Sequence, residues 1–271
     1  MTPAQIRRRV LRWYARQGRD LPWRRTRDPY AILVSEVMLQ QTGVGRVVPA
    51  YARFLRRFPT LGALAAASLA DVLRVWSGLG YNRRARDLHR IARGYPRELP
   101  RTVAELDSLP GIGRYTASAV ASFAFGDRVA FAETNIRRVL GRVALGRTAS
   151  ESEAVAIDER FLPQRVAARW HHALMDIGAT LCARRSPRCG VCPLRALCRY
   201  RGAVEPARRQ SPFVASDRRL RGAIVRALLD GPRSIRRLER HLGDSRVPRL
   251  VDALAGEALV VRAGSLIRLP E

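Results

Sequence analysis

The sequence contains no lysine, so all 50 of its basic residues are arginine. A Schiff-base mechanism requires a nucleophilic amine, which is normally a lysine of lowered pKa. Only the amine of the N-terminus is left for that role. The sequence therefore excludes chemistry that depends on a lysine side chain, including lysine-dependent cleavage of a nucleic-acid strand.

Long hydrophobic runs are also absent. No stretch approaches the roughly 20 apolar residues that a membrane helix needs, and the N-terminus lacks the apolar region of a signal peptide. The first residues are basic and poor in acid, as in a transit peptide, but Ile6, Val10, Trp13 and Tyr14 recur at helical spacing. We interpret them as one face of a docked helix. We expect no membrane partner and a cytoplasmic, nucleoid-associated location.

Acidic residues are scarce. There are 23 of them, and the formal net charge is +27. A GC-rich genome would raise the arginine content without explaining the shortage of acid. An excess of this size predicts a polyanionic partner, and nucleic acid is the most common one.

Cysteine is rare but concentrated. The four cysteines lie within 17 residues in the pattern C-x6-C-x2-C-x5-C. Four thiolates so close together suit a tetrahedral metal or an iron–sulfur cluster. Disulfides are typical of small, cysteine-rich secreted domains, and zinc sites usually have two close pairs, whereas here only the middle two cysteines form one. The pattern favours an iron–sulfur cluster bound by Cys182, Cys189, Cys192 and Cys198.

Apolar spacing predicts an all-α fold up to about residue 200. Helices are expected at 31–39, 47–58, 69–76, 85–92, 116–125 and 167–177. The polar, proline-bearing stretch 201–215 is typical of a linker. After it, three helices at 217–229, 234–242 and 246–255 and a strand–turn–strand over 258–269 predict a winged-helix-like domain. This domain has a structural or a DNA-binding role.

The segment Leu109-Pro110-Gly111-Ile112-Gly113 lies between two expected helices. Gly111 and Gly113 allow positive φ and a close backbone approach. The turn amides and the next helix N-terminus can then hold a phosphate. This is the helix-hairpin-helix signature, and it agrees with the charge excess.

The hairpin, a carboxylate about 20 residues later and the cysteine pattern together resemble the iron–sulfur DNA glycosylases of the endonuclease III superfamily. Leu21-Pro22-Trp23-Arg24 and the run Ser35–Thr42 (SEVMLQQT) resemble the adenine DNA glycosylases within it. The resemblance covers roughly residues 1–200. It implies two helical lobes flanking a DNA cleft: a six-helix barrel lobe at 21–130 and a 4Fe-4S cluster lobe at 1–20 and 131–200, followed by the linker 201–215 and the winged-helix-like domain 216–271.

Removing an adenine requires protonation of the base and stabilisation of a sugar cation, which a glycosidase does with two carboxylates. By resemblance, Glu36 protonates adenine N7 and later handles the attacking water. Its apolar helix would raise its pKa; the alternative is a solvated surface glutamate. The second carboxylate departs from the family, which has aspartate where this chain has Glu133. Glutamate is one methylene longer and is not a preferred helix cap.

Other site residues also follow from the resemblance. Asn135 would orient the acid and water, and Tyr115 stands where endonuclease III has its lyase lysine. Gln41 would fill the space left by the flipped base. The adenine pocket would include Trp23, Arg24 and Asp176, although family members usually have glutamate at the last position. DNA contacts are expected from Gln40, Thr42, Gly111, Gly113, Arg184, Arg185 and Arg188.

The sequence therefore predicts a monofunctional DNA glycosylase that excises adenine opposite 8-oxoguanine or guanine. The partner would be double-stranded DNA with a mispaired or damaged base, bound by a monomer. Glu133 leaves three alternatives open: a slowed enzyme, a glycosylase for thymine or uracil opposite guanine, and a silent DNA-binding homologue. Many family members carry a larger C-terminal domain that checks the opposite base, and this chain ends before it.

Overall fold

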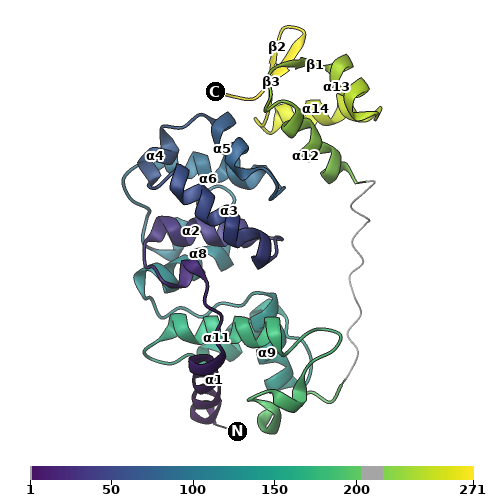
Figure 1. Ribbon diagram of the computed structural model, residues 1–271. Coiled ribbons are helices and arrows are strands. Elements are labelled where there is room, and N and C mark those ends of the chain that lie inside the picture. The colour runs from purple at the N-terminus through teal and green to yellow at the C-terminus, as the bar shows by residue number, and fades with distance from the viewer. Residues whose placement is uncertain (1, 203–215) are drawn as a thin grey trace. The chain divides into compact units, whose positions relative to one another are not determined.

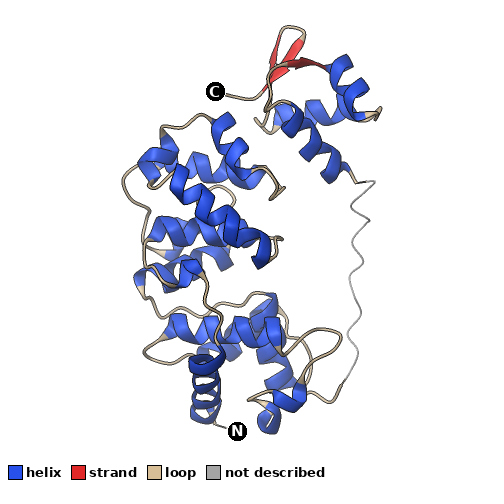
Figure 2. Ribbon diagram, viewed as in Figure 1, coloured by secondary structure: helices blue, strands red, loops and turns tan. Residues whose placement is uncertain are grey.

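The computed structural model describes residues 2–202 and 216–271, and most of them are helical (Figures 1 and 2). The chain forms two compact units. The cysteine unit comprises Met1–Ile32, Arg101–Asp107 and Ile112–Arg208; the Glu36 unit comprises Leu33–Pro100, Ser108–Gly111 and Arg209–Glu271. The expected linker 201–215 falls almost wholly outside the described residues, and the lobe boundaries near residues 20 and 130 stay predictions.

The cysteine unit is a set of helices around α11, which packs against both α1 and α9. Its core includes Trp170, Leu174 and Ile177 of α11, all fully buried. The helices are α1 (Pro3–Gln17), the first turn of α2 (Pro29–Leu39), α7 (Val103–Asp107), α8 (Arg114–Val120), α9 (Thr134–Leu145), α10 (Glu151–Phe161) and α11 (Ala167–Thr180). A π-helical turn, η2 (Ala121–Phe125), continues α8, and η1 (Pro22–Arg24), η3 (Cys189–Val191) and η4 (Arg195–Leu197) are short 3-10 helices.

Helix α1 confirms the docked helix expected at the N-terminus. Thr2 and Gln5 form a capping box, and Pro3 occupies the first turn, where its missing N–H costs nothing. Ile6 and Val10 are fully buried. The apolar stripe faces α11, and arginines occupy other parts of the helix surface.

The Glu36 unit contains the rest of α2 and four further helices of the same lobe. Phe54, Phe58 and Trp76 form an edge-to-face aromatic cluster at its centre, because apolar residues recur at helical spacing on α3 and α5. These helices are α3 (Val44–Arg57), α4 (Leu61–Ala65), α5 (Leu69–Trp76) and α6 (Arg83–Gly94).

The C-terminal segment of the Glu36 unit has the helices and the hairpin that the sequence predicts, with one further strand. The order is α12 (Asp217–Ala227), β1 (Arg233–Ser234), α13 (Ile235–Leu242), α14 (Val247–Gly256), β2 (Val261–Ala263) and β3 (Leu266–Arg268). The strands form an antiparallel sheet of order β1-β3-β2, with Gly264 at positive φ in the hairpin turn. This is the topology of a winged helix. β1 was missed because two residues are too short for a strand pattern.

The winged helix is bonded to the helices of its own unit. Glu257 accepts hydrogen bonds from Arg83 of α6 and Arg221 of α12. The Ala70 N–H of α5 donates to the Pro270 carbonyl at 3.1 Å. Among the described residues, no helix is both long and apolar enough to cross a bilayer.

Candidate active site

Glu36 lies near the middle of α2, and only 5% of it is exposed. Its neighbours Ser35, Val37 and Met38 are buried as well, since α2 is apolar on every side. The Asp28 carboxylate accepts the Tyr30 and Ala31 N–H groups and so caps the start of the helix. The expected solvent-shielded carboxyl group is therefore present, which rules out the solvated surface glutamate.

The C-terminal end of α2 is fixed by Arg84, whose role the sequence did not predict. This arginine is 8% exposed. Its Nη1 donates to the carbonyl groups of Val37, Met38 and Gln40 at 2.9, 2.8 and 2.6 Å. Burial lowers the pKa of Arg84 to about 10. The guanidinium satisfies carbonyls that a helix end leaves without partners.

The residues after α2 are positioned by that anchor. Thr42 is buried and accepts a hydrogen bond from Arg84. Gln41 is exposed and adopts φ = 57°, a conformation that few residues other than glycine adopt. Such local strain is common at functional positions. The turn thus presents the Gln41 side chain to solvent.

The hairpin glycines differ from each other. Gly111 has φ = 74°, and a Cβ there would lie 3.0 Å from the Asp87 carboxylate, so glycine is required. The Gln40 amide donates to the Gly111 carbonyl at 3.5 Å. Gly113 has φ = −114° and precedes α8 as its N-cap. The expected positive φ is therefore wrong for Gly113, whose glycine instead leaves the N-terminus of α8 without a side chain.

Tyr115 lies in the first turn of α8, and its ring packs edge-to-face on Phe131 with centroids 5.7 Å apart. Phe131 is two residues before Glu133. Tyr115 also lines a cavity of about 460 Å³ together with Arg128 and Glu159. The structure thus brings Tyr115 to the segment that leads into α9.

Glu133 is the N-cap of α9. Its Oε1 accepts the Ile136 N–H at 3.0 Å and its Oε2 accepts the Asn135 N–H at 2.8 Å. The expectation that glutamate would be a poor cap is wrong here, because the longer side chain folds back onto the first turn. Burial raises the pKa of Glu133, and the hydrogen bonds from Asn135 and Ile136 offset part of that increase.

Asn135 links Glu133 to the body of the cysteine unit. Its Nδ2 donates to Glu133 Oε2 at 3.1 Å, and its Oδ1 accepts from Arg138 at 2.6 Å. Arg138 also donates to the carbonyls of Gly178 and Cys182, at 2.7 and 2.5 Å. A Cβ on Gly178 would lie 2.4 Å from that of Asn135, so this glycine permits the close contact of α9 with α11.

Asp158 holds the chain just before Glu133. Its fully buried carboxylate accepts from Trp170 Nε1 at 2.7 Å and lies 2.8 Å from His171 Nε2. It also accepts the Phe131 N–H at 3.3 Å. The segment that leads into α9 is therefore fixed by a buried network of hydrogen bonds to the Asp158 carboxylate.

Asp176 is fully buried, and its oxygens accept hydrogen bonds from both Arg19 and Arg24. Arg24 forms a two-bond pair with it at 2.8 Å each, and the Arg19 Nε donates at 2.7 Å. The hydrogen bonds and charge of Arg24 and Arg19 outweigh burial and lower the pKa of Asp176. The ion pair fixes the turn that carries the buried Trp23.

All four cysteines line one cavity of about 370 Å³, whose wall includes Val139, Leu194 and Tyr200. Arg142 donates to the Ala183 carbonyl and lies over the Tyr200 ring. Within residues 2–202 and 216–271, no three ligand side chains converge as a single metal ion would require.

Arg184, Arg185 and Arg188 are exposed in the loop between the first two cysteines, as expected. Arg142 donates to the Arg184 carbonyl at 3.0 Å and ties that loop to α9. The cysteine unit thus holds the loop arginines, the cysteines, Trp23, Arg24, Gly113, Tyr115, Glu133, Asn135 and Asp176. The Glu36 unit holds Glu36, Gln40, Gln41, Thr42 and Gly111.

Three residues that shape the site were missed: Arg84, Arg138 and Asp158. Arginine is so abundant that a buried one leaves no pattern in the sequence. The spacing of Asp158 from Trp170 and His171 also follows no helical period, because they lie on different helices.

A helical fold with this hairpin, a buried glutamate and a cysteine-lined cavity defines a base excision DNA repair protein of the helix-hairpin-helix class. Residues 34–164 match the family described as HhH-GPD superfamily base excision DNA repair protein. The structure is similar to that of a thermostable thymine-DNA glycosylase, with a TM-score of 0.68 and 29% identity over 73% of this chain and 95% of that one. An endonuclease III–DNA covalent intermediate gives a TM-score of 0.63 at 28% identity, over 73% and 96% of the two chains.

Proteins related in sequence identify the family more specifically than the fold does. The chain is 44% identical to the adenine DNA glycosylase of Mycolicibacterium smegmatis over 85% of this chain and 82% of that protein. It is 42% identical to the human adenine DNA glycosylase, over 72% of this chain and 39% of the human one. The chain belongs to the adenine DNA glycosylase family of the HhH-GPD superfamily.

Proposed function

We propose that this protein is a monofunctional DNA glycosylase of base excision repair that excises adenine paired with 8-oxoguanine or guanine. The observation that carries the proposal is the buried Glu36 within SEVMLQQT, in a chain whose relatives at 41–44% identity are named adenine DNA glycosylases. The substrate is double-stranded DNA with a mispaired or damaged base. The protein acts as a monomer in the cytoplasm, at the nucleoid.

The reaction begins with the adenine outside the base stack, because Glu36 cannot reach a stacked base. The exposed Gln41 at the strained end of α2 fills the vacated position. The backbone amides at Gly111 and Gly113 hold the strand, and Gln40 and Thr42 also contact it. The exposed arginines 184, 185 and 188 contact phosphates of the duplex.

Glu36 then donates its proton to adenine N7 as the glycosidic bond lengthens. A general acid is most effective when it is protonated near the working pH, which burial favours. The anionic carboxylate of Glu133 stabilises the positive charge that develops on the sugar. Asn135 orients that carboxylate, and the Tyr115 hydroxyl faces the sugar. Water attacks the sugar carbon, and Glu36 takes the proton of that water.

The adenine pocket is formed by Trp23 and Arg24. Asp176 acts through Arg24, whose guanidinium it holds with two hydrogen bonds. Because no lysine exists in the chain, the product is an intact abasic site and not a cleaved strand.

The four cysteines would hold a 4Fe-4S cluster. Their shared cavity, its apolar wall and the cationic Arg142, Arg195 and Arg201 around it fit an anionic cluster. When bound, the cluster would cross-link the Cys182–Cys189 loop and so fix its arginines. Purified protein should absorb broadly near 400 nm and contain about four irons per chain; a colourless protein with bound zinc would contradict the assignment.

The test is a single-turnover assay on duplexes with A:8-oxoguanine, A:G, T:G and U:G pairs, followed by alkali to reveal abasic sites. We expect excision from the first two only, and strand breaks only after alkali. Excision from T:G or U:G alone would instead identify a thymine or uracil glycosylase. Tight binding to all four without excision would identify a silent binder.

A further inference from the structure

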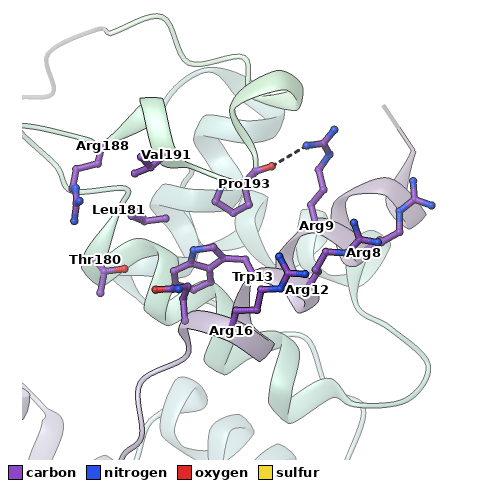
Figure 3. A pocket seen from close by; sticks show the side chains of 11 residues that line it. Arg8, Arg9, Arg12, Trp13, Arg16, Thr180, Leu181, Arg188, Val191 and Pro193 are labelled. Carbon is purple, nitrogen blue, oxygen red and sulfur yellow. Dashed lines mark hydrogen bonds between the residues drawn. The ribbon is translucent and has the colours of Figure 1, made fainter.

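The cysteine unit contains an open groove on the side of α1, with a volume of about 820 Å³ (Figure 3). One wall is α1, and the other comes from the end of α11 and the segment around Pro193. At one end Arg9 donates to the Pro193 carbonyl at 3.4 Å. The residues that line the groove are Arg8, Arg9, Arg12, Trp13, Arg16, Gln17, Thr180, Leu181, Arg188, Val191 and Pro193.

The groove is cationic, with no acidic side chain among the residues that line it. Arg8, Arg12 and Arg16 are four residues apart and form one row along α1, about 6 Å apart along its axis. Figure 3 shows their side chains extending from the same side of the helix. Among residues 2–202 and 216–271, no hydrogen bond or ion pair engages their guanidinium groups.

Most buried arginines of this unit behave differently. Arg24 is paired with Asp176, and Arg138 and Arg142 donate hydrogen bonds to backbone carbonyl groups. Their charges are used in holding the fold. The three arginines of the α1 row therefore carry charge that a polyanion can bind. The row is long enough to contact several successive phosphates.

Trp13 lies within the same groove, between the arginine row and Leu181 (Figure 3). It is half-buried, whereas Trp23, Trp76 and Trp170 are 6%, 0% and 0% exposed. Trp13 is thus the most exposed of the four tryptophans, so that a ligand can stack on its indole. Single-stranded nucleic acids are bound by a cationic groove with an aromatic ring on which a base stacks. An intact duplex offers no unstacked base to such a ring.

We propose that the α1 groove is a second nucleic-acid site, which binds single-stranded DNA. The row of Arg8, Arg12 and Arg16 contacts successive phosphates, and a base stacks on Trp13. Arg188 at the far wall extends the cationic surface toward the loop between the first two cysteines. The arginine row and Trp13 have no role in base excision, whereas Arg188 also belongs to the loop that contacts duplex phosphates. The groove would strengthen binding to gapped DNA relative to an intact duplex.

The test measures binding of an oligothymidylate of 15 nucleotides to the full-length protein through quenching of tryptophan emission. We compare the wild type with R8Q/R12Q/R16Q and with R56Q/R93Q/R97Q, which removes the same charge from exposed positions of the Glu36 unit. The row variant should bind at least about 10-fold more weakly and lose about 2 from the slope of log K against log salt, at roughly 0.7 per phosphate contact. The control should lose less than about threefold.

W13F should abolish the quenching while binding remains measurable by anisotropy of a labelled oligonucleotide. Thermal unfolding of each variant establishes that it is folded. Equal losses in the row variant and the control would overturn the proposal, because net charge alone would then explain binding. A loss on a 15-base-pair duplex with none on oligothymidylate would overturn it as well, since the groove would then serve duplex DNA.

Discussion

The two candidate catalytic carboxylates are held in contrasting ways. Glu36 lies in the apolar helix α2. The backbone of that helix is held in place by the Arg84 guanidinium, which donates to carbonyl groups of its last turn. Glu133 is fixed by a chain of side-chain hydrogen bonds through Asn135 and Arg138. The first environment shields the Glu36 carboxyl group from solvent. In the second, burial raises the pKa of Glu133, and the hydrogen-bond donors of Asn135 and Ile136 offset only part of that increase.

The contrast is tested most strongly at Glu36. Replacement of Glu36 by Gln keeps the shape and removes the proton donor. We expect single-turnover excision of adenine to fall about 10³- to 10⁴-fold, the upper range for general acid catalysis. Unfolding should change little.

The matched control is E98Q at an exposed position, which should retain the wild-type rate. An excision rate of E36Q within about threefold of the wild-type rate would show that Glu36 is not the general acid.

At Glu133, charge and cap can be separated. In E133Q the amide oxygen can still accept one backbone N–H, but the negative charge is gone, so excision should fall about 100-fold. E133D keeps the charge and a preferred cap residue, so it should lose far less. Both are measured as single-turnover rates on A:8-oxoguanine. Equal rates for the two variants would mean that charge is not what Glu133 contributes.

Arg84 should matter for stability more than for chemistry. R84M leaves the carbonyl groups of Val37, Met38 and Gln40 without this donor. At roughly 1–3 kcal/mol for each, we expect a loss of at least about 3 kcal/mol in the free energy of unfolding. Urea denaturation measures it. The neighbouring R83M removes a surface ion pair with Glu257 and should cost less than about 1 kcal/mol. Comparable losses of stability in R84M and R83M would show that the hydrogen bonds of Arg84 to α2 do not stabilise the fold more than a surface ion pair does.

The smallest effect concerns pH. Burial raises the pKa of Glu133 above its ordinary value of 4.5, so the acidic limb of the excision rate should lie above pH 4.5 and disappear in E133Q. The contribution of Glu133 to the free energy of unfolding changes with pH in the opposite direction to the rate. It is fully present below pH 4.5 and is lost as pH rises through the raised pKa of Glu133. An acidic limb in E133Q identical to that of the wild type would assign it to another group.

The parts of the site that follow local rules were predictable from the sequence. Helical spacing gave α2 and its buried Glu36, and the cysteine pattern gave the residues of one cavity. The predictions that were wrong or missing concern residues whose conformation or partners depend on tertiary contacts. Gly113 has an ordinary φ because the turn needs only one left-handed residue, and Glu133 caps α9 because its carboxylate folds back. Arg84 and Arg138 bind carbonyl groups remote in sequence, which no local pattern encodes.

The central claim of the proposed function is that the carboxyl groups of Glu36 and Glu133 serve one reaction. The direct measurement is a double-mutant cycle of single-turnover adenine release from an A:8-oxoguanine duplex, with wild type, E36Q, E133Q and E36Q/E133Q. Residues that act together are strongly non-additive, so the double variant should be only slightly slower than the slower single variant. Losses that multiply, or a single variant at the wild-type rate, would contradict the account.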